Sequence, residues 1–182
     1  MYAKLSSLTL FSGLLLMAAL LIPSTSFAET NRFSRAFCLK AHGQFLNVQG
    51  HNLREVKVNS PRCKEWERFS FERWGGNPNE LAIKSVAHGT YLNCLPNPPS
   101  AGRNVHGDAG RRQAWEQWNV SSSDANGDRW KDHHGSRPHV TIRCTAHGGN
   151  GYLAVCGSDA CNRGGIKPKR DAVWQIIWQE NW

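Results

Sequence analysis

The sequence lacks the short motifs that commonly accompany catalysis, including Gly-x-Ser-x-Gly, His-Glu-x-x-His and a glycine-rich phosphate loop. No stretch has helical periodicity, and no segment after residues 8–22 is apolar enough to span a membrane. Acidic residues are also few, with 14 Asp and Glu against 22 Lys and Arg. These absences argue against an enzyme and against a helical protein, and they favour a basic all-β protein that acts by binding, with no cofactor and no metal.

Residues 1–28 have the layout of a secretory signal peptide. Lys4 supplies a positive charge, residues 8–22 form an apolar run, and small residues lead up to Ala28. A membrane-spanning helix needs roughly 20 apolar residues, and this run is shorter than that. We therefore predict cleavage after Ala28, which leaves one domain over residues 29–182 in a secreted or periplasmic protein without a membrane span.

The cysteines agree with export, because all six lie after the predicted cleavage site and their number is even. Their spacing is too scattered for a zinc site, which favours close cysteine pairs. We predict disulfides, with one bond between the two cysteines that bracket residues 157–160; the remaining pairing is open from sequence alone. The six residues are Cys38, Cys63, Cys94, Cys144, Cys156 and Cys161.

Two short motifs recur three times in the same order. The first contains Ala-His-Gly and is followed by an aromatic residue and leucine; the second begins with tryptophan. Such repetition predicts three copies of one structural unit, over about residues 37–80, 81–138 and 139–182. The repeated positions are His42, Gly43 and Trp66, then His88, Gly89 and Trp115, then His147, Gly148 and Trp174.

Each copy is predicted to contain four short strands, because apolar and polar residues alternate between turns. One copy could not bury its apolar face alone, so the three must form one domain. The polar stretch between Val120 and His139 is expected to be a long loop. The predicted strands are residues 37–40, 45–48, 55–58 and 66–71, then 81–84, 91–94, the vicinity of 104–105 and 115–120, then 140–143, 152–156, the vicinity of Ile166 and 174–178.

This order of motifs resembles the fascin-like β-trefoil, most strongly at residues 87–92 and 115–118. The resemblance covers essentially the whole predicted mature chain. It implies an all-β fold of three pseudo-symmetric four-stranded repeats, forming a six-stranded barrel capped by hairpins. The ricin-type lectin trefoil is the nearest rival, but its Gln-x-Trp signature occurs once, at residues 113–115, while Lys64 and Ala172 occupy the matching places. The third copy departs from the fascin-like pattern at Gln175, where Glu is usual.

The three repeated histidines, His42, His88 and His147, invite interpretation as a metal site. Each precedes a glycine in an expected tight turn, where the glycine supplies a positive φ and the polar neighbour lies on the surface. Threefold symmetry would also hold the three imidazoles apart. A structural role in turns is therefore preferred.

The repeated tryptophans Trp66, Trp115 and Trp174 are predicted to be core or barrel-lining anchors, because large aromatic side chains dominate the energy of a small core. Glu67 and Glu116 follow two of these tryptophans. They could form a catalytic pair by residue type, but copies in separate repeats do not converge on one bond. We expect them on the solvent side of their strands.

Positive charge is clustered along the chain. Removing Lys4 with the signal peptide from a chain of net charge +8 leaves +7 on the predicted domain. Clustered basic residues attract anionic polymers, and in an exported protein the candidates are acidic polysaccharide, lipid head groups and, least favoured, extracellular nucleic acid. A basic surface that only maintains solubility is the alternative. The basic residues before each repeated tryptophan are Arg62 and Lys64, then Arg111 and Arg112, then Lys167, Lys169 and Arg170.

Three tryptophans lie outside both the repeated motifs and the predicted strands: Trp74, Trp130 and Trp182. Trp130 lies in the long loop near Asp128 and His133, and a flat indole beside polar groups suits the apolar face and hydroxyls of a sugar. We predict a ligand site there, although such a tryptophan can instead fix its loop to the barrel. The His133-His134 pair with nearby aspartates is expected to be a hydrophilic loop tip.

Two functional classes follow. The first is an exported carbohydrate-binding, lectin-like protein. The second is a protein-binding module, either an actin-binding protein of the fascin kind or a docking subunit of a toxin or adhesin. Inhibition of binding by sugars separates the first class from the second.

Overall fold

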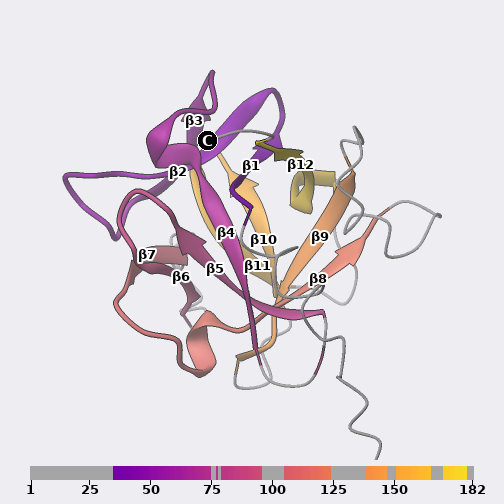
Figure 1. Ribbon diagram of the computed structural model, residues 1–182. Coiled ribbons are helices and arrows are strands. Elements are labelled where there is room, and N and C mark those ends of the chain that lie inside the picture. The colour runs from indigo at the N-terminus through magenta and orange to yellow at the C-terminus, as the bar shows by residue number, and fades with distance from the viewer. Residues whose placement is uncertain are drawn as a thin grey trace, which may run out of the picture.

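The computed structural model describes residues 35–74, 77, 79–95, 105–123, 138–146, 151–164 and 170–179, and its strands surround a common core (Figure 1). Over these residues the chain forms the twelve strands expected of three four-stranded repeats. They are β1 (Phe37–Ala41), β2 (Gln44–Val48), β3 (Val56–Ser60), β4 (Phe69–Arg73), β5 (Glu80–Ser85), β6 (Tyr91–Cys94), β7 (Val105–Ala109), β8 (Trp118–Ser122), β9 (His139–Cys144), β10 (Gly151–Cys156), β11 (Asp159–Gly164) and β12 (Val173–Trp178).

Six of these strands close a barrel. β1 pairs with β4, β4 with β5, β5 with β8, β8 with β9, β9 with β12, and β12 again with β1, all antiparallel. The other six form the hairpins β2–β3, β6–β7 and β10–β11, and the first and third hairpins pair at Lys57 and Asp159. Closure leaves no barrel strand with an unpaired edge. The fold is a β-trefoil, and the predicted six-stranded barrel with hairpins is confirmed.

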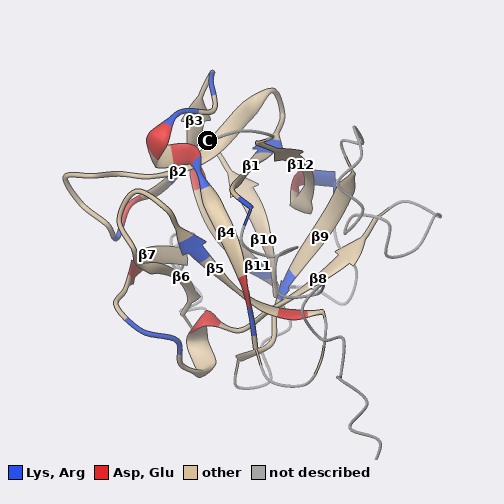
Figure 2. Cartoon of the chain, viewed as in Figure 1, with Lys and Arg blue, Asp and Glu red and all other residues tan. Residues whose placement is uncertain are grey.

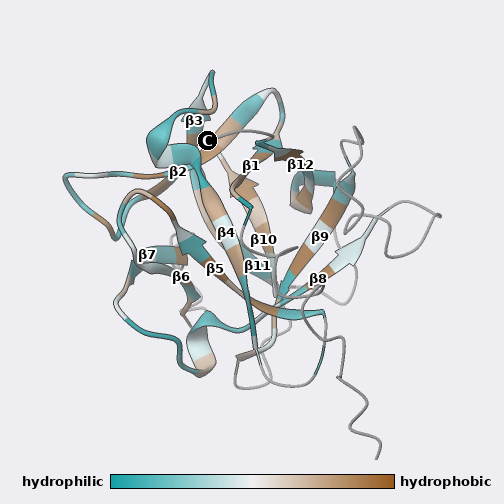
Figure 3. Cartoon of the chain, in the orientation of Figure 1, coloured by the Kyte–Doolittle hydropathy of each residue, from teal (hydrophilic) through white to brown (hydrophobic). Residues whose placement is uncertain are grey.

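The barrel is filled by alternate residues of its six strands, because successive side chains of a strand point to opposite faces. Hydrophobic stretches accordingly follow barrel strands such as β9 (Figure 3). Phe37 of β1 stacks on Phe71 of β4 with 4.1 Å between ring centroids. Each barrel strand contributes two large apolar side chains at alternate positions to this core, which are Phe37, Leu39, Phe69, Phe71, Leu81, Ile83, Trp118, Val120, Val140, Ile142, Trp174 and Ile176.

The Ala-His-Gly motif marks turns, as predicted. His42 and Gly43 connect β1 to β2 with φ of +50° and +80°, and two positive φ values in a two-residue loop fit the twist of a hairpin. Gly89, between β5 and β6, has φ of +67°. His147 and Gly148 lie outside the described residues.

Three strand predictions are wrong in position. The fourth strand of the first two repeats begins at Phe69 and Trp118, because short 3-10 turns, η2 (Glu65–Glu67) and η3 (Ala114–Glu116), precede them. The third repeat has a matching turn, η6 (Arg170–Ala172). Its third strand is β11 and not the vicinity of Ile166, because a tight turn at Gly157, with φ of +69°, returns the chain immediately after β10.

Three disulfides connect the six cysteines. The predicted Cys156–Cys161 bond is present across the β10–β11 hairpin. Cys38 of β1 is bonded to Cys63 just before η2, and Cys94 of β6 to Cys144 of β9; both pairings were open from sequence. In the described part of the chain no helix has the length and apolar character needed to cross a membrane. The three disulfides are consistent with a secreted protein, whereas the predicted signal peptide lies outside the described residues.

Candidate binding surfaces

The predicted loop site cannot be placed. Trp130, Asp128 and His133 lie outside the described residues, as do Lys167 and Lys169. The remaining predicted basic residues, which are exposed in the structure, are Arg62, Lys64, Arg111, Arg112 and Arg170. Basic and acidic residues both occur along the described strands and turns in the view of Figure 2.

The three repeated tryptophans do not occupy equivalent places. Trp174 lies on β12, fully buried, and its Nε1 donates to the carbonyl of Leu153 at 2.7 Å. Its counterparts in the barrel are Phe69 and Trp118, because each occupies the matching buried position of its own strand. The expectation of a core anchor is therefore correct for Trp174 alone.

Trp66 and Trp115 are instead the middle residues of η2 and η3, and Asp171 occupies that position in η6. Trp115 is half-buried against the core. Trp66 is 42 % exposed, so its predicted role as a core anchor is wrong. Each indole lies on a turn outside the barrel, because the turn precedes the strand that enters the core.

Glu67 and Glu116 are buried, and the expectation that they face solvent is also wrong. Each side chain reaches back to close its 3-10 turn: the backbone N–H of Lys64 donates to Glu67 at 2.8 Å, and that of Gln113 donates to Glu116 at 2.6 Å. Burial raises the pKa of Glu116, although backbone hydrogen bonds oppose the shift. The repeated Trp-Glu pair is therefore a device for building a turn.

Trp66 lies beside residues from two other loops, and we call Trp66, His88 and Gly50 the Trp66 platform. The ring centroids of Trp66 and His88 are 6.2 Å apart with an interplanar angle of 47°. Nε2 of His88 lies 3.1 Å from the carbonyl oxygen of Val48. Gly50 passes close under the indole, because a Cβ at this residue would lie 2.8 Å from Cζ2 of Trp66. His88 is thus a half-buried neighbour of an aromatic surface, beyond its predicted role in a turn.

The segment that carries Trp66 is held at several points. The Cys38–Cys63 disulfide ties it to β1 three residues before the indole, and Glu67 caps its turn one residue after. The carbonyl of Arg68 then accepts a hydrogen bond from the N–H of Val86, two residues before His88. The chain is therefore anchored on both sides of Trp66, so little backbone freedom remains to be lost there on binding.

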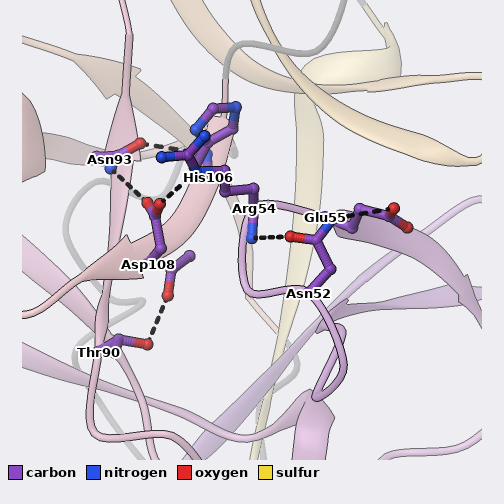
Figure 4. A network of polar contacts seen from close by, with 8 residues as sticks. Asn52, Arg54, Glu55, Thr90, Asn93, His106 and Asp108 are labelled. Carbon is purple, nitrogen blue, oxygen red and sulfur yellow. Dashed lines mark hydrogen bonds and ion pairs between the residues drawn. The ribbon is translucent and has the colours of Figure 1, made fainter.

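A second polar cluster joins the hairpins of the first two repeats (Figure 4). Arg54, before β3, forms an ion pair with Asp108 of β7 at 3.1 Å, and the amide of Asn93 donates to the other oxygen of Asp108 at 3.2 Å. The N–H of Gly107 donates to the carbonyl of Leu53 at 2.8 Å. Each polar group in this cluster has a protein partner, which indicates that the cluster holds the two hairpins together.

A third cluster surrounds Glu72 of β4. Its carboxylate accepts hydrogen bonds from Nζ of Lys84 at 3.2 Å and from the hydroxyl of Tyr91 at 2.9 Å. Nε of Arg112 lies 3.7 Å from the same carboxylate. The hydrogen bond that Lys84 donates to Glu72 raises the pKa of Lys84, although partial burial opposes the shift. Arg112 also donates to the carbonyl of Arg73 at 2.8 Å. Arg73 is not among the predicted basic residues, because those residues precede the repeated tryptophans in the sequence.

Metal binding finds no support in the described part of the chain. No group of three or more His, Cys, Asp and Glu side chains in the described ranges is arranged to hold an ion. His42 is exposed on its hairpin and His88 contacts Val48, so the two do not converge on one point.

No family model and no curated protein matches this sequence. Solved structures do match the fold. A structure described as the BEL β-trefoil in an apo crystal form is 18 % identical with a TM-score of 0.61, covering 80 % of this chain and 94 % of its own. A designed threefold-symmetric protein named ThreeFoil is 14 % identical with a TM-score of 0.60, covering 78 % of this chain and 97 % of its own. At such identities the likeness establishes the β-trefoil fold, and neither the fascin-like nor the ricin-type branch.

Proposed function

We propose that this protein is an exported, non-catalytic carbohydrate-binding protein and that the Trp66 platform holds a sugar ring. The β-trefoil often serves carbohydrate or protein binding, but fold alone does not choose between them. The choice rests on the chemistry of the exposed surface.

The observation that carries the proposal is the exposure of Trp66. Trp118 and Trp174 are fully buried, and the other described tryptophans, Trp74, Trp115 and Trp178, are half-buried. Trp66 alone among these described tryptophans is exposed, although burying an indole is a large source of stability. A rigid indole left in solvent beside an imidazole provides a flat apolar surface with polar groups at its border.

Such a border suits a sugar ring. The C–H face of a pyranose can pack on the indole, while His88 and the exposed side chains of Lys64 and Glu65 are polar groups close in sequence or space to Trp66 for its hydroxyls. The three disulfides and the predicted signal peptide support export. The loop with Trp130, Asp128 and His133 is proposed as a further sugar contact.

The test is binding of the oxidised protein to an array of neutral glycans at low and high salt, with Trp66→Ala, Trp66→Phe and Trp130→Ala compared. If the indole provides the stacking surface, Trp66→Ala weakens binding by about 30-fold, which is about 2 kcal/mol, and Trp66→Phe retains part of it. Val86→Ala is the matched control, because Val86 is 48 % exposed near the platform but has no aromatic face.

Two results contradict the proposal. If Trp66→Ala and Val86→Ala bind glycans as well as the unmodified chain, the platform is not the sugar site. If the array shows no binding at all, protein binding becomes the better explanation of an exposed tryptophan, and co-sedimentation with actin filaments tests its fascin-like form.

A further inference from the structure

Three arginines meet at the C-terminal end of β4, although they come from two distant parts of the chain. Arg73 ends β4, while Arg111 and Arg112 lie in the segment between β7 and η3. The guanidinium of Arg112 donates to the backbone carbonyl of Arg73 at 2.8 Å, which fixes the two segments together. All three arginines are exposed, and we call them the Arg73 cluster.

Positive charge exceeds negative charge among the described groups around Arg111 and Arg112. Glu72 is the carboxylate that Arg112 approaches, and Lys84 already lies on one of its oxygens while Tyr91 and Arg112 approach the other. The carboxylate of Glu80, on the neighbouring strand β5, accepts a hydrogen bond from Gln117 at 2.8 Å. Two basic side chains, Lys84 and Arg112, therefore share Glu72, and Arg111 adds a third positive charge next to Arg112.

The arginines are also oriented before any ligand arrives. Arg112 is held by the carbonyl of Arg73 and by Glu72. With its amide oxygen turned toward Arg111, Gln113 accepts from that guanidinium at 2.7 and 3.1 Å. Gln113 is in turn fixed, because its N–H donates to the buried Glu116. Planar guanidinium groups held in this way match the paired oxygens of sulfate and carboxylate groups.

We infer that the Arg73 cluster is a second binding surface, which takes the sulfate or carboxylate groups of an acidic polysaccharide. The anion chemistry follows from the arginines themselves, whereas the choice of a polysaccharide rests on the proposed function at Trp66. The two surfaces lie at opposite ends of β4, because η2 leads into its first residue and Arg73 is its last. A five-residue strand separates its ends by about 13 Å, so the two surfaces are distinct sites.

The experiment measures binding of the oxidised full chain to immobilised heparin, a sulfated polysaccharide, as a function of salt. Arg111→Gln with Arg112→Gln is expected to weaken binding by at least about tenfold and to lower the slope of log affinity against log salt by about two. Arg73→Gln is expected to weaken binding by a smaller factor. Thermal unfolding of each variant checks that it folds.

The matched control is Arg35→Gln with Arg62→Gln, which removes the same charge at the other end of β4 from two exposed arginines. The control is expected to change affinity by less than about threefold, because distant charges act only through the screened net field. If both double variants weaken heparin binding equally, binding depends on net charge alone, and the Arg73 cluster is not a specific site. Absence of heparin binding by the unmodified chain, or stronger binding to duplex DNA of equal charge, would overturn the polysaccharide assignment.

The two proposals fail separately. Trp66→Ala is expected to retain the heparin binding that depends on Arg111 and Arg112. Loss of neutral-glycan binding without change in heparin binding refutes nothing about the Arg73 cluster, and an empty neutral array leaves the anion site to be judged on the arginine variants alone.

Discussion

Glu116 offers a sharp test of how the 3-10 turns are built. Its side chain is 4 % exposed, and one carboxylate oxygen accepts the N–H of Gln113 at 2.6 Å. Glu116→Ala removes this acceptor and leaves a backbone N–H without its partner inside a packed turn. Glu116→Gln keeps an acceptor oxygen of nearly the same shape but removes the charge.

The expected magnitudes follow from those contacts. Loss of a capping side chain costs about 1 kcal/mol, and a buried donor left unsatisfied costs about 1–3 kcal/mol. The capping cost and the cost of the unsatisfied donor both describe the loss of the same hydrogen bond, so they do not add. Glu116→Ala is therefore expected to lower the free energy of unfolding by about 2 kcal/mol at neutral pH. Glu116→Gln is expected to change it by less than about 1 kcal/mol, because the acceptor remains.

The pH dependence has a definite sign. Burial raises the pKa of Glu116 in the folded state, so the folded protein binds this proton more tightly than the unfolded chain does. The resulting contribution to stability is complete below the unfolded pKa and is lost as the pH rises through the folded pKa. Relative to Glu116→Gln, the unmodified protein should therefore lose stability between acid and neutral pH.

Urea unfolding at a series of pH values, followed by tryptophan fluorescence, measures these differences. Glu65→Ala serves as the control, because Glu65 is an exposed acid of η2 whose side chain does not close the turn. The reasoning is refuted if Glu116→Ala is no more destabilising than Glu65→Ala. It is also refuted if the difference between Glu116→Gln and the unmodified chain does not depend on pH.

Two further predictions concern stability. Gly107→Ala should lower the free energy of unfolding by about 1–3 kcal/mol, because the new Cβ would lie 2.7 Å from Val48 Cγ1. The control Gly110→Ala should change it by less than about 0.5 kcal/mol, because a Cβ there meets nothing within 4 Å. Equal effects of the two substitutions in chemical unfolding would contradict the tight packing of β7. Replacing Cys38 and Cys63 by alanine opens a span of 25 residues and should cost roughly 3 kcal/mol in thermal unfolding, against roughly 2 kcal/mol for the hairpin disulfide with its span of 5. The reverse order would contradict a loop-entropy origin, and Trp66 fluorescence should become more sensitive to quenchers only in the first variant.

Local pattern was sufficient for the number of strands and for most of their positions, but not for the tryptophans. The sequence aligned Trp174 with Trp66 and Trp115 because all three carry the same residue. In the structure Trp174 matches Phe69 and Trp118, because all three repeats have a 3-10 turn before the strand and the middle residue of that turn is Trp66, Trp115 and Asp171 in turn. Matching the three repeats by their shared tryptophans was therefore wrong. Matching them by the alternation of buried positions along each strand gives the correct equivalence.

The glutamates show the same limit. Glu67 and Glu116 were expected on the solvent side because charged residues seldom lie buried. A short acidic side chain three residues after an exposed backbone N–H can instead close a turn, which the Lys64 and Gln113 contacts demonstrate. That signal is present in the sequence, but the same spacing also occurs in ordinary strands.

The sequence by itself determined the threefold repeat, the number of strands and the glycine turns, because these depend on neighbours a few residues apart. One disulfide was also readable, since its cysteines face each other across a short hairpin. Only the tertiary structure decided that Trp66 meets His88 and that Arg73 meets Arg112, because these pairs come from loops and strands of different repeats. Such meetings depend on how the closed barrel sets its registers, and no local periodicity carries that information.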